Sequence, residues 1–327
     1  MVALKSTNCL VCAVDLGGTN LRAATVDRDG HIHQRARFPT PQTTDPQEIV
    51  SAIAAAVAEC AKQAAGQIRY VSVVVPGSVQ PQSGLTVNAP NVPAIVGFAL
   101  KEALESRLEQ PVLIENDANA AAVGEMWFGA GRGLKTIVCF TLGTGVGSGV
   151  ILNGEIWRGI DGTGGEIGHT SVDPCGGVQC KCGNTGCLEV YASATGLVRI
   201  ARELLPLHPQ SALQEIAAAD LSAKAIAHAA QHGDACALAA FETMATRLGI
   251  GVANIVNALN PEAIVIAGGV SAAFDLFAPR VRAEVMRRAF PVPAQRCRIV
   301  KAECGDDAGL VGAARLAFDA QESATPA

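Results

Sequence analysis

The stretch from His169 to Glu189 constrains this chain more than any other, because it gathers one imidazole and four thiols. Three of the thiols, those of Cys180, Cys182 and Cys187, are separated by glycines and short polar turns. Imidazole and thiolate groups are the ligands of tetrahedral zinc sites in proteins. Four protein ligands leave no coordination position for water, so the sequence predicts a structural ion rather than a catalytic one.

Two other interpretations of these cysteines are disulfide bonds and small buried apolar side chains. The first residues, Met1 to Thr7, lack the apolar core of a secretory signal, so we expect a cytoplasmic protein with reduced thiols. Cys180 and Cys182 are also too close in sequence to favour pairing with each other. The sequence therefore predicts zinc on His169, Cys180, Cys182 and Cys187, with Cys175 as a spare thiol and alternative ligand.

Length and composition bound the class of protein. A chain of 327 residues is longer than chains that usually form a single hydrophobic core, so we expect two lobes. Hydrophobic residues make up 49% of the chain and charged residues 17%, which is typical of a well-buried, soluble α/β protein. The formal net charge of −5 argues against a nucleic-acid partner. No apolar run reaches the length of a membrane span, so no membrane partner is expected either.

Segments with the apolar patterns of strands and helices alternate along the chain, which predicts an α/β fold. Thr44, Asp45 and Pro46 form a helix start signal. The expected strands cover residues 10–15, 21–26, 70–75, 112–115, 136–142, 150–152, 263–267 and 298–301, with a glycine loop at 143–149. The expected helices cover residues 47–65, 98–108, 118–126, 191–205, 235–259, 274–289 and 308–320.

Two glycine turns share one local pattern. Residues 15–19 (Asp-Leu-Gly-Gly-Thr) and 141–145 (Thr-Leu-Gly-Thr-Gly) each follow an apolar strand and precede a returning one. Either turn alone is typical of a simple hairpin. Together, one in each lobe, they favour a phosphate site, because glycine lets backbone N–H groups approach an anion closely. Neither turn ends in the Lys-Ser/Thr of a P-loop, and the Asp15 carboxylate suits a hydrated magnesium ion.

Asn116 and Asp117 are the strongest candidates for chemistry. They follow the expected strand 112–115 and precede a helix, at the edge of an open α/β sheet where ligands usually bind. One interpretation of Asp117 is a simple helix N-cap. The other is a general base that accepts the proton of an attacking hydroxyl, for which its ordinary pKa of about 4 is no obstacle in phosphoryl transfer.

Four further polar side chains lie in apolar or glycine-rich surroundings. Asn91 could cap a turn, and Glu189 could cap a turn or form an ion pair. Taken with Asn116 and Asp117, they and Glu166 supply planar donors and acceptors suited to a ring of hydroxyls. His169 could serve twice, with one ring nitrogen on zinc and the other toward a ligand.

These motifs together resemble the ROK family of bacterial sugar kinases and repressors, which share an actin-like, hexokinase-like ATPase fold. The resemblance covers essentially the whole chain. The Gly-Glu-Ile-Gly-His block and the cysteine block are its most specific parts, and the glycine turns are less specific. The matching segments are residues 15–20, 90–91, 115–119, 142–147, 165–169 and 180–189.

The resemblance implies a role for each matched position. Asp117 would be the general base on the 6-hydroxyl of a hexose. The sugar would contact Asn91, Asn116, Asp117, Glu166, His169 and Glu189. The phosphates of ATP and Mg²⁺ would be held by Asp15, Gly17, Gly18, Thr19, Asn20, Gly143, Thr144, Gly145 and Gly147, with Gly268 and Gly269 against the adenosine.

The resemblance also implies a two-lobed α/β architecture with an inserted structural zinc knot. Residues 1–118, completed by about 302–327, would form the N-terminal lobe. Residues 119–301 would form a larger lobe that carries the zinc site and much of the nucleotide site. Members of the family are often dimers or tetramers, so a homo-oligomer is expected.

The expected activity is ATP-dependent phosphorylation of a hexose, with glucose as the first candidate. A kinase for N-acetylmannosamine or N-acetylglucosamine is a related alternative, because the same hydroxyl contacts would survive. A sugar-sensing regulator without catalytic activity belongs to a different class. In this family it carries a DNA-reading domain ahead of the sugar domain, and only 14 residues precede Asp15. A zinc-ribbon interaction module would leave both glycine turns and Asp117 unexplained.

Overall fold

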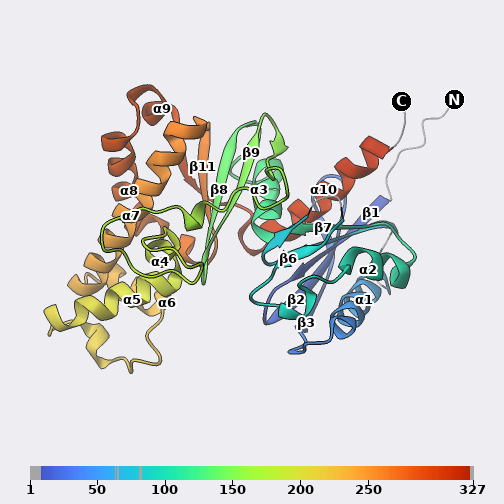
Figure 1. Ribbon diagram of the computed structural model, residues 1–327, viewed down its shortest axis with the longest axis horizontal. Coiled ribbons are helices and arrows are strands. Elements are labelled where there is room, and N and C mark those ends of the chain that lie inside the picture. Colours follow the sequence, from blue (N-terminus) through green and yellow to red (C-terminus); the bar gives the residue numbers. More distant parts are fainter. Residues whose placement is uncertain (1–8, 63, 65, 81–82, 325–327) are drawn as a thin grey trace.

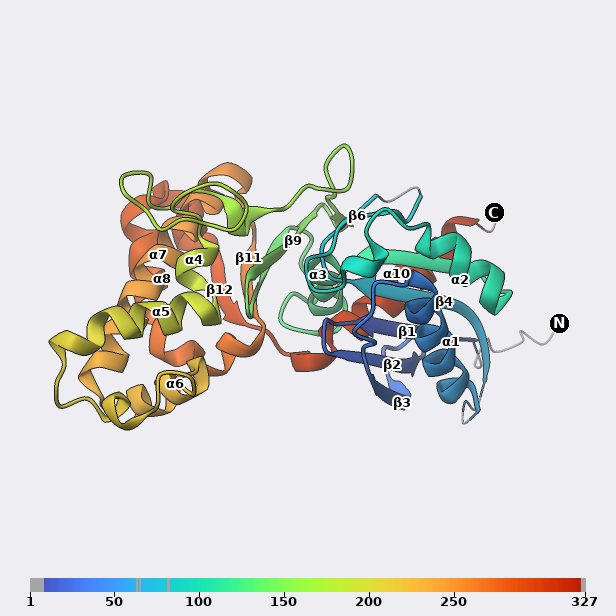
Figure 2. The same ribbon diagram turned by 60° about the horizontal axis from the view of Figure 1, so that its bottom comes forward.

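The computed structural model describes residues 9–62, 64, 66–80 and 83–324. Two five-stranded mixed sheets lie in the two halves of an elongated molecule, with helices α3 (Asp117–Phe128) and α10 (Ala308–Ala324) between them (Figures 1 and 2). The fold is therefore α/β, as the alternation of segments predicted.

The first sheet has the strand order β3-β2-β1-β4-β7. Antiparallel pairing joins the first three strands of the chain, and parallel pairing joins β1 to β4 and β4 to β7. One face packs on helices α1 and α2, and the other packs on α3 and α10. The elements are β1 (Cys9–Leu16), β2 (Asn20–Val26), β3 (Ile32–Pro39), α1 (Pro46–Lys62), β4 (Gln67–Val75), α2 (Leu100–Leu108) and β7 (Val112–Asn116), with a small ribbon of β5 (Ser78–Val79) and β6 (Thr86–Asn88).

The second sheet has the strand order β10-β9-β8-β11-β12. Alternate side chains of its strands face opposite sides. Ile137 and Cys139 belong to the central layer with α3 and α10, whereas Val138 and Phe140 belong to the core with the outer helices. The elements are β8 (Ile137–Leu142), β9 (Val146–Leu152), β10 (Glu155–Ile156), α4 (Glu189–Ala192), α5 (Ala194–Leu204), α6 (Ala223–Gln231), α7 (Ala235–Leu259), β11 (Ala263–Ala267), α8 (Phe274–Arg288), α9 (Pro291–Arg296) and β12 (Arg298–Lys301).

Both sheets repeat one topology. Each begins with an antiparallel run of three strands and continues with two parallel crossovers, so β1 corresponds to β8 and β4 to β11. The two glycine turns occupy equivalent places, because one joins β1 to β2 and the other joins β8 to β9. The short sequence repeat thus coincides with a repeat of whole sheets.

Two glycines allow α3 and α10 to cross closely between the sheets. A Cβ atom on Gly124 would lie 2.2 Å from the carbonyl oxygen of Ala308, and one on Gly312 would lie 1.7 Å from that of Ala120. Neither contact leaves room for a side chain. Helix α10 also packs on β1 and β4 of the first sheet.

Helix α7 forms the centre of the outer core. Its Gly249 and Gly251 weaken a helix prediction from sequence, yet both face close neighbours, the side chains of Glu284 and Leu188. Among the described helices α7 alone is long and apolar enough to cross a membrane, but 56% of its most apolar window is buried inside the protein. It contacts α5 and α8 along its length, as a core helix does.

The structure corrects four expectations about the elements. The strand expected at 150–152 begins at Val146, because Gly147 and Gly149 pack directly on α3, next to Ala118 and Ala122, and keep their pairing with β8. The helix expected at 191–205 is broken at Ser193. Strand β3 and helices α6 and α9 were not expected at all. The helix expected at 47–65 ends at Lys62, and residues 63 and 65 lie outside the described part.

Local chemistry explains the break at Ser193 and the unexpected strand. The Ser193 hydroxyl accepts a hydrogen bond from the backbone N–H of Gly196 at 3.0 Å, which makes it the N-cap of α5. Strand β3 is an edge strand in which only Ala36 is buried, so it lacks the apolar alternation that identifies half-buried strands.

Candidate active site

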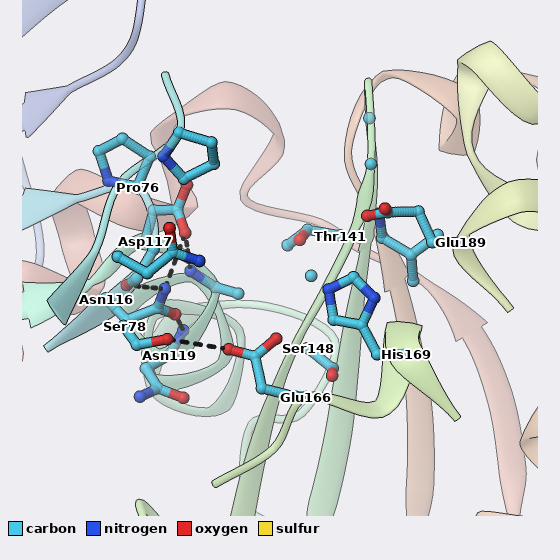
Figure 3. A pocket seen from close by; sticks show the side chains of 18 of the residues that line it. Pro76, Ser78, Asn116, Asp117, Asn119, Thr141, Ser148, Glu166, His169 and Glu189 are labelled. Atoms are coloured by element: carbon cyan, nitrogen blue, oxygen red, sulfur yellow. Dashed lines mark hydrogen bonds between the residues drawn. The ribbon is translucent and has the colours of Figure 1, made fainter. Parts of the chain in front are cut away.

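A cavity of about 420 Å³ opens where the carboxyl ends of β4, β7, β8 and β11 face one another (Figure 3). This edge is the usual ligand site of open α/β sheets. The cavity brings together residues that are far apart in the sequence. Of the predicted site residues, it is lined by Asn91, Asn116, Asp117, Gly143, Thr144, Gly145, Gly147, Glu166, His169, Glu189 and Gly268.

Asn116, not Asp117, caps helix α3. The Oδ1 atom of Asn116 accepts a hydrogen bond from the backbone N–H of Asn119 at 2.9 Å, and its Nδ2 donates to the Gly77 carbonyl at 2.8 Å. Asp117 is the first helical residue, and its Oδ1 accepts from the Ala118 N–H at 2.8 Å. The interpretation of Asp117 as a simple cap is therefore wrong, and its carboxylate faces the cavity.

The Asp117 carboxyl has an unusual acidity. Its side chain is exposed to the cavity, but protein atoms crowd it closely enough to disfavour the charged form. This desolvation, with the nearby carboxylate of Asp15, raises the pKa of Asp117 to about 6. The value differs from the ordinary pKa of about 4 assumed from the sequence. A base with a pKa of about 6 is better matched to neutral pH than an ordinary carboxylate is.

Glu166 enters the cavity from the opposite side. It lies just before the short 3-10 helix Ile167–His169, and its Oε1 accepts a hydrogen bond from the Ser78 hydroxyl at 3.2 Å (Figure 3). Gly165 turns the chain into this position with a φ of 87°. Ser148 holds the same turn, because its hydroxyl donates to the Gly165 carbonyl and accepts from the Ile167 N–H.

The β8–β9 turn presents backbone groups to the cavity. A Cβ atom on Gly145 would lie 2.4 Å from the Glu189 carboxylate, and one on Gly147 would lie 2.6 Å from the Thr141 hydroxyl. Glu189 accepts a hydrogen bond from the Val146 N–H at 3.0 Å and so fixes the turn. Gly268 closes against it with a φ of 79°, where a Cβ would meet the Leu142 carbonyl at 2.6 Å. The result is a glycine cradle suited to phosphates.

The Asp15 turn lines a neighbouring hollow of about 360 Å³ rather than the same cavity. The Asp15 carboxylate is paired with the guanidinium of Arg22. The two hollows adjoin, since a Cβ on Gly18 would lie 3.0 Å from the Asn91 Cβ. This second hollow is lined by Asp15, Gly17, Gly18, Thr19, Asn20, Arg22, Arg37 and Asp306, whereas Gly269 lines neither.

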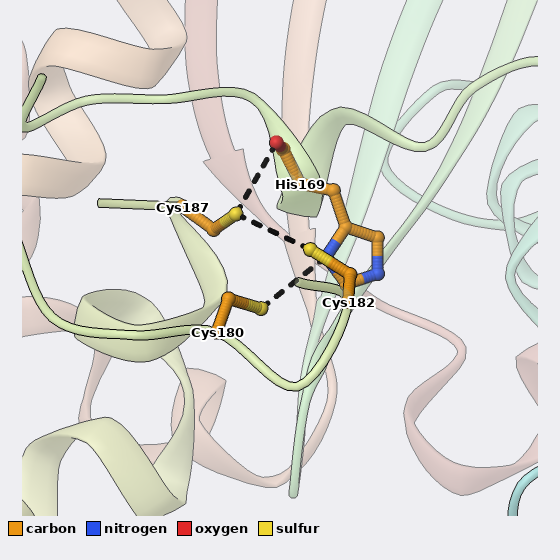
Figure 4. Close-up of side chains that lie close together, drawn as sticks. All are labelled: His169, Cys180, Cys182 and Cys187. Atoms are coloured by element: carbon orange, nitrogen blue, oxygen red, sulfur yellow. Dashed lines mark hydrogen bonds between the residues drawn. The ribbon is translucent and has the colours of Figure 1, made fainter. Parts of the chain in front are cut away.

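The four predicted zinc ligands converge (Figure 4). Their donor atoms all lie within 4.8 Å of one another. The Cys180 sulfur is 3.7 Å from His169 Nδ1, and the sulfurs of Cys182 and Cys187 are 3.7 Å apart. Sulfur ligands on a tetrahedral zinc ion with bonds of about 2.3 Å are separated by about 3.8 Å. The donor set therefore fits zinc, and His169 belongs both to this cluster and to the cavity wall.

Sequence reasoning missed several residues of the cavity wall. Ser78 follows the Pro-Gly pair at the end of β4, and a polar residue just past a buried parallel strand was the signal that could have identified it. Asn119 was visible only as part of a matched motif. The lining residues that were not predicted include Pro76, Gly77, Ser78, Asn88, Asn119, Thr141 and Ser148.

Comparisons with known proteins identify the family of this chain. The model of the ROK family matches residues 11–320. A glucokinase from Halalkalibacterium halodurans is 40% identical over 318 residues, which cover 95% of each chain. An N-acetylmannosamine kinase from Escherichia fergusonii is 34% identical over 305 residues, which cover 93% of this chain and 97% of that one.

Similarity of structure gives the same result. A ROK family glucokinase from Streptomyces griseus, crystallised with glucose and AMPPNP, superposes with a TM-score of 0.82. It is 35% identical in sequence, and the match covers 95% of this chain and 99% of that one. The chain described here therefore belongs to the ROK family.

Proposed function

We propose that this protein is an ATP-dependent sugar kinase that phosphorylates glucose at its 6-hydroxyl. The observation that carries the proposal is the carboxylate of Asp117 in the wall of a polar cavity that the β8–β9 glycine turn also lines. The likeness to glucokinases over nearly the whole chain supports the same activity.

Asp117 would act as the general base. A sugar hydroxyl is a weak nucleophile until its proton has an acceptor, and phosphoryl transfer asks little else of the protein than positioning and neutralisation of charge. Asn116 holds the turn in front of Asp117, and its Nδ2 lies 3.2 Å from the Asp117 carboxylate. Asn91, Glu166, His169 and Glu189 would bind the sugar hydroxyls, because they line the same cavity as this carboxylate.

The phosphates would lie between the two glycine turns. A Cβ atom on Gly143 would meet nothing within 4 Å, so this turn has open space for an anion beside Gly143, while Gly145 and Gly147 pack against the side chains of Glu189 and Thr141. Asp15 fits a hydrated Mg²⁺, because it supplies a carboxylate close enough to Asp117 to raise the pKa of that carboxyl. When bound, the ion would neutralise charge on the phosphates. Thr19 and Asn20 would help Asp15 to hold the phosphates and the ion, and Gly268 and Gly269 would lie against the adenosine.

The cysteine cluster would hold a structural zinc ion on His169, Cys180, Cys182 and Cys187. The donor separations support this assignment. With its Nδ1 on the metal, His169 would keep its other ring nitrogen for the sugar. Exposed Cys175 is not part of the cluster of four.

We also retain the proposed division into an N-terminal lobe, 1–118 with about 302–327, and a larger lobe, 119–301. The packing of α10 on β1 and β4 supports it. Residues 1–8 and 325–327 lie outside the described part of the chain. A cytoplasmic location and a homo-oligomeric state also stand as proposals.

A panel of sugars tests the proposed activity. The purified protein is incubated with MgATP and glucose, mannose, fructose, N-acetylglucosamine or N-acetylmannosamine, and ADP release is measured. We expect the highest kcat/KM with glucose. A preference for an N-acetylhexosamine would reassign the substrate, and no turnover with any sugar, together with sugar binding by calorimetry, would favour the regulator.

A further inference from the structure

One ion pair with a buried carboxylate joins the two halves of the cavity. Glu115 is the next-to-last residue of strand β7 and directly precedes Asn116 and Asp117; its side chain is only 6% exposed, and that of Arg158 is 28% exposed. Arg158 follows strand β10 of the second sheet. Its Nε donates to Glu115 Oε2 at 2.8 Å, and one of its terminal nitrogens lies 2.7 Å from the same oxygen.

The other oxygen of Glu115 is used within the first half of the cavity. Oε1 accepts hydrogen bonds from the Asn116 backbone N–H at 2.9 Å and from Asn119 Nδ2 at 3.0 Å. One oxygen of the carboxylate, Oε1, therefore binds the turn that carries Asp117. The other oxygen, Oε2, binds Arg158, which follows the second sheet's strand β10. Each oxygen of the carboxylate is satisfied, as a buried charge requires.

Arg158 stands at the neck of the loop that leads to Glu166. The Gly164 N–H donates to the Arg158 carbonyl at 2.9 Å, so the chain leaves and returns at this point. A Cβ on Gly164 would lie 2.7 Å from the carbonyl carbon of Arg158, so the two ends of this loop are packed in direct contact. Two residues later Glu166 enters the cavity. The position of Arg158 therefore limits where Glu166 can lie.

We infer that Arg158 is a positioning residue for sugar phosphorylation: its pair with Glu115 fixes the Glu166 loop relative to the Asp117 turn. A buried pair gains little net stability, because desolvation of both charges offsets their attraction. The pair instead contributes a fixed distance between Asp117 and Glu166, the two groups that would act on the same sugar. The inference rests on the proposed kinase activity.

The test compares steady-state kinetics of Arg158→Gln, Glu115→Gln and the double variant with those of the wild type. We expect the KM for glucose to rise about tenfold or more in each single variant, since small displacements of binding groups are costly. The KM for ATP should change less than about twofold, because Glu189 fixes the phosphate turn separately. The double variant should be no worse than the singles, as for residues that act as a unit.

Two further variants separate positioning from stability. Arg288→Gln is the matched control, because it removes one guanidinium from Glu284, a carboxylate that is likewise buried, with 2% exposed, but lies on α8. Its KM for glucose should stay at the wild-type value. Arg158→Lys keeps the charge with fewer donors, so it should be intermediate. Arg158→Lys also replaces Arg158→Gln in the test if Arg158→Gln does not fold.

The outcomes are distinguishable. If the variants of Arg158 lose thermal stability but keep the wild-type KM for glucose and the wild-type kcat, the pair is only structural and the inference is wrong. An equal rise in the KM for ATP would contradict it as well. If the wild type phosphorylates no sugar, the proposed function itself fails.

Discussion

At the scale of single residues, the acidity of Asp117 links activity to pH. With its pKa raised to about 6, the carboxylate is available as a base only above that pH. We predict that kcat/KM for glucose falls about tenfold for each pH unit below 6. A pH profile between 4.5 and 8 measures this limb; a profile that is flat down to pH 4.5 would show that the proton acceptor is another group.

The raised pKa of Asp117 lowers the stability of the folded protein as the pH rises, although it is the same deprotonation that makes the base available. Because the folded pKa exceeds the unfolded value of about 3.9, the folded state binds more protons, and stability from this group is lost as pH rises from about 4 to 6. Asp117→Asn removes the charge. The variant should therefore gain stability relative to the wild type above pH 6, which denaturant unfolding at pH 5 and pH 7.5 can compare.

Residues that depend on local sequence were predictable, and those that depend on distant partners were not. Asp117 and the four residues proposed as zinc ligands stand in specific motifs. The raised pKa of Asp117 depends first on desolvation by the surrounding protein and then on Asp15, and no local pattern connects either to Asp117. Glu115 and Arg158 are 43 positions apart, and their pairing follows only from the meeting of the two sheets.

At the scale of elements, the proposed zinc site concerns the loop that holds the cysteine cluster, and we expect the stability of this loop to depend on the metal. We predict that Cys182→Ala loses bound zinc, lowers the melting temperature by about 5 °C or more and raises the KM for glucose, because His169 lines the cavity as well. Zinc content by mass spectrometry of the native protein, calorimetry and kinetics measure the three effects.

Cys175→Ala is the control for this loop, since its thiol is exposed and outside the cluster. It should keep zinc, stability and activity. A chelator should reproduce the Cys182→Ala effects in the wild type. If Cys182→Ala retained zinc and full activity, the ligand assignment would be wrong.

Prediction of the elements succeeded where apolar periodicity was strong and failed where it was weak. Helix α7 and strands β11 and β12 were predicted at their observed bounds. Strand β3 was missed because it is an edge strand whose side chains are mostly exposed. The start of β9 was missed because its glycines resemble a loop in sequence, although they are needed for contact with α3.

At the scale of the whole molecule, the repeated sheet order explains why the two glycine turns occupy equivalent places in the two sheets. A short sequence repeat suggested this, but the sequence contained no evidence for the shared strand order. The placement of α3 and α10 in one layer between the sheets also came only from the structure. That layer joins Asp117, at the start of α3, to both halves of the cavity.

The most direct measurement is the formation of glucose 6-phosphate from glucose and MgATP by the wild type and by Asp117→Asn at pH 7.5. We expect turnover by the wild type and a fall in kcat of at least about 10²-fold in the variant, which loses a positioned base. Its fold and most sugar hydrogen bonds should remain, so glucose affinity should change less. Near wild-type turnover by Asp117→Asn, with turnover abolished in Asp15→Asn or Glu166→Gln, would contradict the assignment of Asp117 as the base.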